Sequence, residues 1–110
     1  MKPSSPLGEF EIIVLLAALR LRHEATGSRV RDEIERQTSR RIARGAVYVT
    51  LDRLESKGLV KSRQLPGTPE RGGRPTRVYL VQPQGVRGVE TFLTAIERMR
   101  SGLNLAVDRS

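Results

Sequence analysis

The chain has no cysteine and no tryptophan, and it holds only two phenylalanines and two tyrosines among its 110 residues. Without cysteine it has no disulfide framework, no thiolate ligands for zinc and no thiol-based redox switch. With so few aromatic residues, the hydrophobic core must be built from aliphatic side chains. The same scarcity argues against a stacking platform for single-stranded RNA, which needs exposed rings for the bases.

Long hydrophobic runs are missing as well. The unbroken apolar run at residues 12–19 has eight members, which is too short for a membrane span. Glu9 and Glu11 precede this run, and Arg20 and Arg22 follow it where a signal peptide would need a small-residue cleavage site. We therefore expect a cytoplasmic protein with no membrane association.

Candidate catalytic and metal-binding residues are scarce. His23 is the one histidine and has no second histidine or cysteine for a metal site. Glu9 and Glu11 are two residues apart, so on a helix they point to different sides and form no carboxylate pair. Gly72 and Gly73 lie within an expected hairpin, which is not the strand-to-helix position of a nucleotide-binding loop. We expect no catalytic residue, no metal, no cofactor and no enzymatic activity.

Positive charge is abundant and unevenly placed. Between Arg40 and Leu80, ten basic residues face three acidic ones, so this segment carries seven of the eight net positive charges. A strongly basic chain fits a polyanionic partner, or a protein that is merely basic and soluble. The local concentration of the charge favours a binding surface in this segment.

Helical periodicity predicts two helices before this segment. Residues 7–22 are apolar almost all round, which indicates a helix buried on more than one side. Ser5 is its expected N-cap and Pro6 suits its first turn. Residues 28–37 carry a narrow apolar stripe and predict a second helix that packs on one side only.

A third helix is predicted from Arg44, with Val47, Leu51 and Leu54 spaced to lie on one inner face. Gly58 is placed to end it in the left-handed conformation. The side chains expected to point away from the core are Ala46, Tyr48, Thr50 and Arg53.

A hairpin and a last helix complete the chain. Residues 59–65 predict a strand, residues 66–75 hold three prolines and three glycines and predict a loop, and residues 76–81 predict the returning strand. Pro83 suits the first turn of a helix that runs to about Gly102.

The last helix carries a heptad-like seam of apolar residues. The seam consists of Val89, Phe92, Ile96, Met99 and Leu103. It could pack on the first helix of its own domain or form a dimer with a second copy. Because the first helix is also apolar all round, we favour the dimer and add Phe10 and Val14 to its interface.

Three helices followed by a hairpin is the winged helix-turn-helix plan. The segments 45–60 (GAVYVTLDRLESKGLV), 72–81 (GGRPTRVYLV) and 7–19 (LGEFEIIVLLAAL) together resemble PadR-type transcriptional regulators over roughly residues 7–93. The expected fold is mainly α with a two-stranded β-hairpin wing: a winged helix-turn-helix domain over residues 7–81 and a C-terminal dimerisation helix over residues 82–103.

The resemblance implies function as well as fold. It implies a homodimeric repressor that binds double-stranded DNA at a palindromic operator. It is compatible with a small-molecule effector but identifies none, and the absence of tryptophan removes the usual stacking residue of a flat aromatic drug pocket. Two alternatives stay open, namely a basic winged helix that binds RNA and one that serves protein contacts.

Candidate DNA contacts follow from the chemistry of the third helix. Thr50 and Arg53 are expected to read base edges, because arginine commonly binds guanine and threonine can reach a base or a thymine methyl group. Tyr48 would contact a phosphate, or it would fill the core under the second helix. Arg53 could instead pair with a neighbouring acid. Arg44 and Ala46 complete the expected contacts on this helix.

The loop and strands of the hairpin supply the remaining candidates. They are Lys61, Arg63, Arg71, Gly73, Arg74 and Arg77. Glycine allows the backbone to approach closely, and arginine suits a narrow minor groove or a phosphate pair. The alternative is a flexible hairpin tip that happens to be basic.

Overall fold

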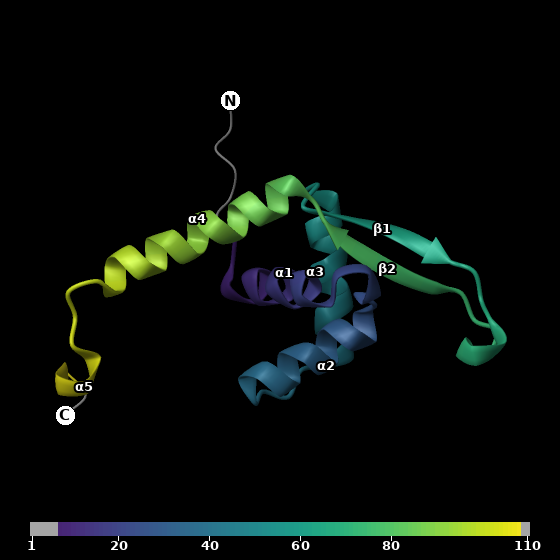
Figure 1. Cartoon of the computed structure of the whole chain (residues 1–110), viewed down its shortest axis with the longest axis horizontal. Coiled ribbons are helices and arrows are strands. Elements are labelled where there is room, and N and C mark those ends of the chain that lie inside the picture. Colours follow the sequence, from purple (N-terminus) through teal and green to yellow (C-terminus); the bar gives the residue numbers. More distant parts are fainter. Residues whose placement is uncertain (1–6, 109–110) are drawn as a thin grey trace.

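A computed structural model describes residues 7–108, without the side chains of residues 71, 107 and 108. Three helices form the body, and the hairpin and the long fourth helix extend from it in opposite directions (Figure 1). The elements in order are α1 (Glu9–Leu21), η1 (Arg22–Glu24), α2 (Gly27–Thr38), α3 (Arg44–Ser56), β1 (Val60–Leu65), η2 (Pro69–Arg71), β2 (Thr76–Val81), α4 (Pro83–Arg100) and α5 (Leu105–Asp108). The predicted fold class, mainly α with a two-stranded hairpin, is confirmed.

The first helix lies at the centre of the core. It contacts α2, α3, α4 and β2, which explains why its sequence is apolar almost all round. Val14 is fully buried by these elements of its own chain, so its assignment to a dimer interface is wrong. The expected helix start at Ser5 and Pro6 lies outside the described residues, and within them Gly8 is the N-cap.

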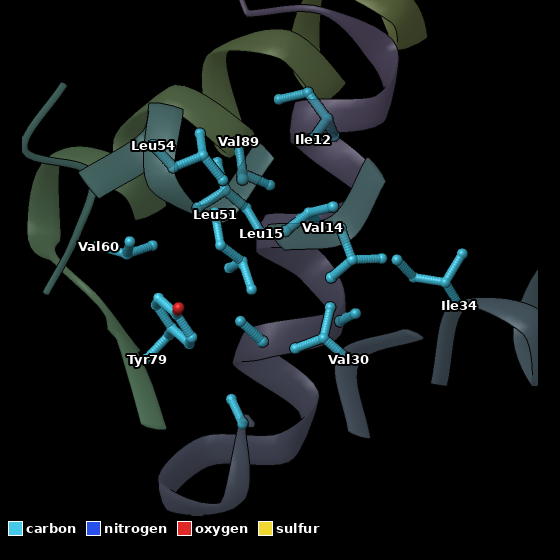
Figure 2. Close-up of a cluster of buried hydrophobic side chains, with 14 residues drawn as sticks. Ile12, Val14, Leu15, Val30, Ile34, Leu51, Leu54, Val60, Tyr79 and Val89 are labelled. Carbon is cyan, nitrogen blue, oxygen red and sulfur yellow. The ribbon is translucent and has the colours of Figure 1, made fainter. Parts of the chain in front are cut away.

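The core is aliphatic, as the composition predicts (Figure 2). Side chains from all the main elements meet in it, with Tyr79 as the one buried ring among the residues that the structure describes. The largest fully buried side chains are Leu15, Ile34, Leu51, Leu54, Val14, Val30, Val47 and Val60. Since α1, α2, both strands and α4 all contribute to this one cluster, the position of α3 is fixed from several sides.

Gly58 ends α3 as the sequence predicts. Its φ angle of +76° lies in the left-handed region, where residues with a side chain are strained. The Gly58 N–H donates to the Glu55 carbonyl, and the Leu59 N–H donates to the Leu54 carbonyl, each at 2.9 Å. This is the Schellman arrangement of a helix C-terminus, and it sends the chain directly into β1.

The two strands pair antiparallel, with Val60 opposite Val81 and Leu65 opposite Thr76. The connector between α1 and α2 adds a short third segment, because Thr26 forms an isolated bridge with Val78. The Tyr79 N–H also donates to the Ala25 carbonyl at 2.9 Å. The hairpin is therefore attached at its base to the residues that start α2.

The fourth helix begins at Pro83, as predicted, and its first turns are held against the body. Val89 is buried in the core, so its assignment to a dimer interface is also wrong. A Cβ at Gly85 would lie 2.5 Å from the Leu59 carbonyl oxygen, and only glycine permits that approach. The short helix α5 was not predicted. No helix among residues 7–108 is long and apolar enough to cross a membrane.

Candidate nucleic-acid interface

The outer face of α3 is the set of helix residues that solvent reaches. It consists of Arg44, Gly45, Ala46, Tyr48, Val49, Asp52, Arg53 and Ser56. Thr50 does not belong to it, because only 5% of its surface is exposed. The prediction that Thr50 reads bases is therefore wrong, and the cause is visible in the spacing. Thr50 is three residues after Val47 and four before Leu54, which places it on the inner face.

Val49 and Asp52 are outer-face residues that the sequence analysis missed. Val49 is 57% exposed despite its apolar side chain. The signal was helical spacing from residues that were expected outside: Val49 is three residues after Ala46 and four before Arg53, and Asp52 is four after Tyr48. An aspartate here can accept a hydrogen bond from the amino group of cytosine, and a valine can contact a methyl group.

Tyr48 combines the two roles that the sequence left open. It is 40% exposed, yet its ring lies directly against the first residue of α2. A Cβ added at Gly27 would lie 2.3 Å from Tyr48 Cε1 and 2.7 Å from its hydroxyl oxygen. Tyr48 therefore packs on the start of α2 while the rest of the ring faces solvent.

Two of the basic residues near α3 are already engaged within the protein. Lys57 Nζ lies 2.8 Å from Glu11 Oε2, and Arg40 lies 2.9 Å from the exposed carboxylate of Glu9. Burial raises the pKa of Glu11, but the hydrogen bonds from Lys57 and from the Gly8 N–H outweigh it, so the pKa is lowered overall. This partly buried ion pair, with Glu11 inside and Lys57 near the surface, ties α1 to the end of α3.

Most of the other basic residues of this region are exposed. Six of them form neither an ion pair nor a hydrogen bond with any side chain that the structure describes: Arg41, Arg44, Arg53, Lys61, Arg63 and Arg74. In particular, Arg53 does not pair with Asp52 or Glu55, and Glu55 instead accepts hydrogen bonds from Ser62. Arg44 and Arg53 belong to the outer face of α3, Arg41 lies just before the helix, and Lys61, Arg63 and Arg74 lie on the hairpin that follows it.

The wing, defined here as residues 60–81, has an ordered turn at its tip. Gly72 and Gly73 have positive φ angles, and the Gly73 N–H donates to the Thr68 carbonyl at 2.8 Å. A Cβ at Gly67 would lie 2.2 Å from the Gly73 carbonyl oxygen, so the two sides of the loop touch. Arg74 is exposed beside this turn. The side chain of Arg71 lies outside the described part of the chain.

Arg77 lies on the strand and not at the tip. It is exposed and donates to the Ser62 hydroxyl at 2.8 Å across the hairpin. Lys61 and Arg63, on the opposite strand, are exposed as well. Basic side chains therefore continue from the base of the wing to its tip.

The outer half of α4 presents an apolar stripe to solvent. Its large exposed members are Leu93, Ile96 and Met99, and Leu103, also exposed, lies just beyond the end of the helix. Phe10 and Phe92 are half-buried and pack against the core at the inner end of α4. The predicted seam is thus divided between the core of the chain and a free surface.

A groove of about 270 Å³ lies between α1 and α2. Ile13, Leu16, Ala17 and Ile34 form its apolar part, and Arg20 and Glu33 lie among its polar lining residues. Glu33 is buried and accepts hydrogen bonds from Arg20, Arg36 and Gln37, of which the one from Arg20 contributes most to lowering its pKa.

Comparison with known proteins gives a family match. The model of the transcriptional regulator PadR-like family matches residues 15–91. No curated protein matches the chain.

Solved structures show the same fold at low sequence identity. A PadR family transcriptional regulator from Eggerthella lenta is 22% identical, with a TM-score of 0.69 over 93% of this chain and 88% of that one. F93 from STIV, a winged-helix DNA-binding protein, is 15% identical, with a TM-score of 0.70 over 91% of this chain and all of the other. Bordetella bronchiseptica BpsR, whose DNA binding is regulated by 6-hydroxynicotinic acid, is 23% identical, with a TM-score of 0.63 over 96% of this chain and 74% of BpsR.

Proposed function

Because the chain belongs to the PadR-like family of transcriptional regulators, we propose that it is a homodimeric repressor that binds a palindromic operator in double-stranded DNA. The observation that carries this proposal is the set of six unpaired cations on α3, just before it and on the wing. Phosphate neutralisation by such cations supplies affinity, and a few side chains that reach base edges supply specificity. We also propose that the protein acts in the cytoplasm, in the same compartment as the DNA it would bind.

The winged-helix domain, residues 7–81, is the DNA-binding part of this proposal. Its helix α3 enters the major groove, where Arg53 pairs with guanine and Asp52 is available to cytosine. Tyr48, held against α2, presents its ring and hydroxyl near the phosphates. Arg44 and Arg41 reach the backbone from the start of the helix.

The wing contacts the DNA beside the groove that α3 occupies. Arg74 at the ordered tip suits a narrow minor groove, and Lys61, Arg63 and Arg77 suit the phosphates along the hairpin. We assign Arg71 and Gly73 to the same contact because they belong to the tip.

Dimerisation is the role that we assign to residues 82–103. An exposed apolar stripe on a single helix is unfavourable in water and suits a partner helix. Ile96, Met99 and Leu103 are the centre of the seam, and Phe10 and Phe92 border it. A two-fold dimer would place two copies of α3 on successive half-sites and so explain a palindromic operator.

A small-molecule effector fits this assembly as a further partner. The groove between α1 and α2 offers apolar walls and a charged end, which suits a small amphipathic molecule. The effect of 6-hydroxynicotinic acid on BpsR, a protein of similar fold, supports the search for such a compound.

The decisive experiment selects duplexes from a random-sequence pool with the purified chain. The selected duplex and an unselected duplex then compete for binding at near-physiological salt, with a single-stranded RNA of equal length as a third competitor. We expect the selected duplex to compete at least a thousandfold better than the unselected one. Equal competition by both duplexes would contradict sequence-specific regulation, and preference for the RNA would favour the RNA-binding alternative.

A further inference from the structure

We propose that Val49 is a specificity-determining residue that contacts the 5-methyl group of thymine in the operator. This inference rests on the proposed binding of α3 in the major groove and adds the base that the centre of the helix selects. The inference starts from an exposed apolar side chain that does not contribute to the hydrophobic core.

Val49 occupies the middle of the outer face. Helix neighbours lie three and four residues away, which are Gly45 and Ala46 on one side and Asp52 and Arg53 on the other. All four are exposed. Because Gly45 and Ala46 have no side chain or only a methyl group, the backbone of α3 can come close to a base pair on that side of Val49.

The packing of the chain gives Val49 no other role. It is absent from the hydrophobic core and from the partly buried residues around it. The other large aliphatic residues that are exposed belong to α1, α4 and the segment after α4. Val49 lies on α3, away from that stripe. A β-branched residue also forms helices less well than alanine does, so the helix gains nothing from it.

The chemistry points to thymine. In the major groove only thymine presents a methyl group, and apolar side chains recognise it by direct contact. Burying one methyl group between two apolar surfaces improves binding about fourfold. Arginine and aspartate on the same face would read guanine and cytosine by hydrogen bonds, so valine supplies recognition that they do not.

Uracil substitution tests this contact, because uracil pairs like thymine and lacks only the methyl group. The duplex selected by the wild-type chain is synthesised with uracil at one thymine position at a time. At one or two positions of each half-site we expect wild-type affinity to fall about fourfold. Val49→Ala should bind the thymine and uracil duplexes equally, with the affinity of the wild type for the uracil duplex.

Two controls separate the contact from indirect effects. Thr94→Ala, which shortens another exposed β-branched residue but lies on α4 and not on α3, should keep the wild-type discrimination. Val49→Ala should unfold at the same urea concentration as the wild type or at a slightly higher one, since alanine is the better helix former.

Two outcomes would overturn the inference while the selected duplex still defeats random DNA, which would leave the proposed function intact. One is that Val49→Ala keeps the full preference for thymine, and the other is that no uracil position weakens binding by the wild type. Failure of the wild-type chain to select any sequence would overturn both proposals.

Discussion

At the scale of single residues, Gly27 shows how a missing side chain can place an aromatic ring. The first residue of α2 has no Cβ, and the ring of Tyr48 occupies that space. The two residues are 21 positions apart in the sequence, and no local pattern links them. The packing of α3 on α2 thus depends on a contact that only the folded chain reveals.

Gly27→Ala should lower the free energy of unfolding by about 1 kcal/mol or more, because the new methyl group overlaps the Tyr48 ring. Urea denaturation measures the change. Gly45→Ala is the matched control: its Cβ would meet nothing within 4 Å, and the higher helix propensity of alanine should leave stability unchanged or slightly raised.

The double variant identifies the cause of that loss. If the clash with the ring is responsible, adding Gly27→Ala to Tyr48→Ala should cost no further stability. An equal loss with and without the ring would mean that Gly27 acts through the helix start and not through Tyr48.

A second residue-scale prediction concerns acid stability. The pKa of Glu11 is lowered in the folded protein, so its carboxylate stabilises the fold above the unfolded-state value of about 4.5. That contribution is lost as the pH falls through the lower, folded-state pKa. Glu11→Gln should therefore cost about 1 kcal/mol at pH 7 and much less near pH 3.

Urea denaturation at both pH values measures the difference between Glu11→Gln and wild type. Glu97→Gln is a suitable control, since this carboxylate pairs with Arg100 on an exposed surface. A destabilisation by Glu11→Gln that is the same at pH 7 and pH 3 would show that the charge of Glu11 is not what stabilises the fold.

At the scale of elements, several of the boundaries that the sequence predicted well are fixed by one residue with a strict backbone preference. Gly58 ends α3, Pro83 opens α4, and the strand at residues 76–81 agrees with the structure. Two features without such residues were missed. The bridge at Thr26 pairs with Val78, which is distant in the sequence, and the helix α5 has only four residues, too few for a helical pattern.

The assignment of side chains to the inner or outer face of a helix was wrong where it followed residue polarity instead of helical spacing. Thr50 is polar but lies inside, and Val49 is apolar but lies outside. Val14 and Val89 were assigned to a dimer because their helices are apolar, whereas folding brings α1 and α4 together within one chain. The sequence alone could not show that packing within a single chain buries both Val14 and Val89.

The wing gives a prediction of its own. Replacing Arg74 and Arg77 by alanine should weaken DNA binding at all sequences and reduce the slope of log affinity against log salt by up to about two. Fluorescence anisotropy titrations at several salt concentrations measure the slope. Arg100→Ala, on α4 and far from the wing, should leave it unchanged. An unchanged slope for the double variant would remove the wing from the DNA contact.

At the scale of the whole molecule, the two halves of α4 lie in different environments. Its first turns belong to the core through Val89 and Gly85, and its outer half leaves the body (Figure 1). Packing within one chain leaves the apolar stripe on that outer half exposed to solvent. The core is therefore formed within one chain, and the exposed stripe is the surface to which we assign the proposed dimer.

Ile96→Asp should convert the protein to monomers, because a carboxylate at the centre of the seam would lose its hydration on dimerisation. Sedimentation velocity measures the mass. Thr94→Asp places the same charge on the exposed polar side of α4 and should leave a dimer. Dimers of both variants would place the interface elsewhere on the chain.

The close contact of Gly85 with the Leu59 carbonyl has a consequence for which operators the dimer can use. Leu59 follows the Schellman turn that ends α3, and Gly85 lies in the first turn of α4. The proposed dimerisation helix α4 therefore starts beside the end of α3, the helix that would enter the groove. No flexible linker intervenes between them. The distance between the two copies of α3 is then a property of the folded dimer. One inserted base pair moves a half-site by about 3.4 Å and a tenth of a turn, and the dimer could follow it only by bending the DNA or distorting α4.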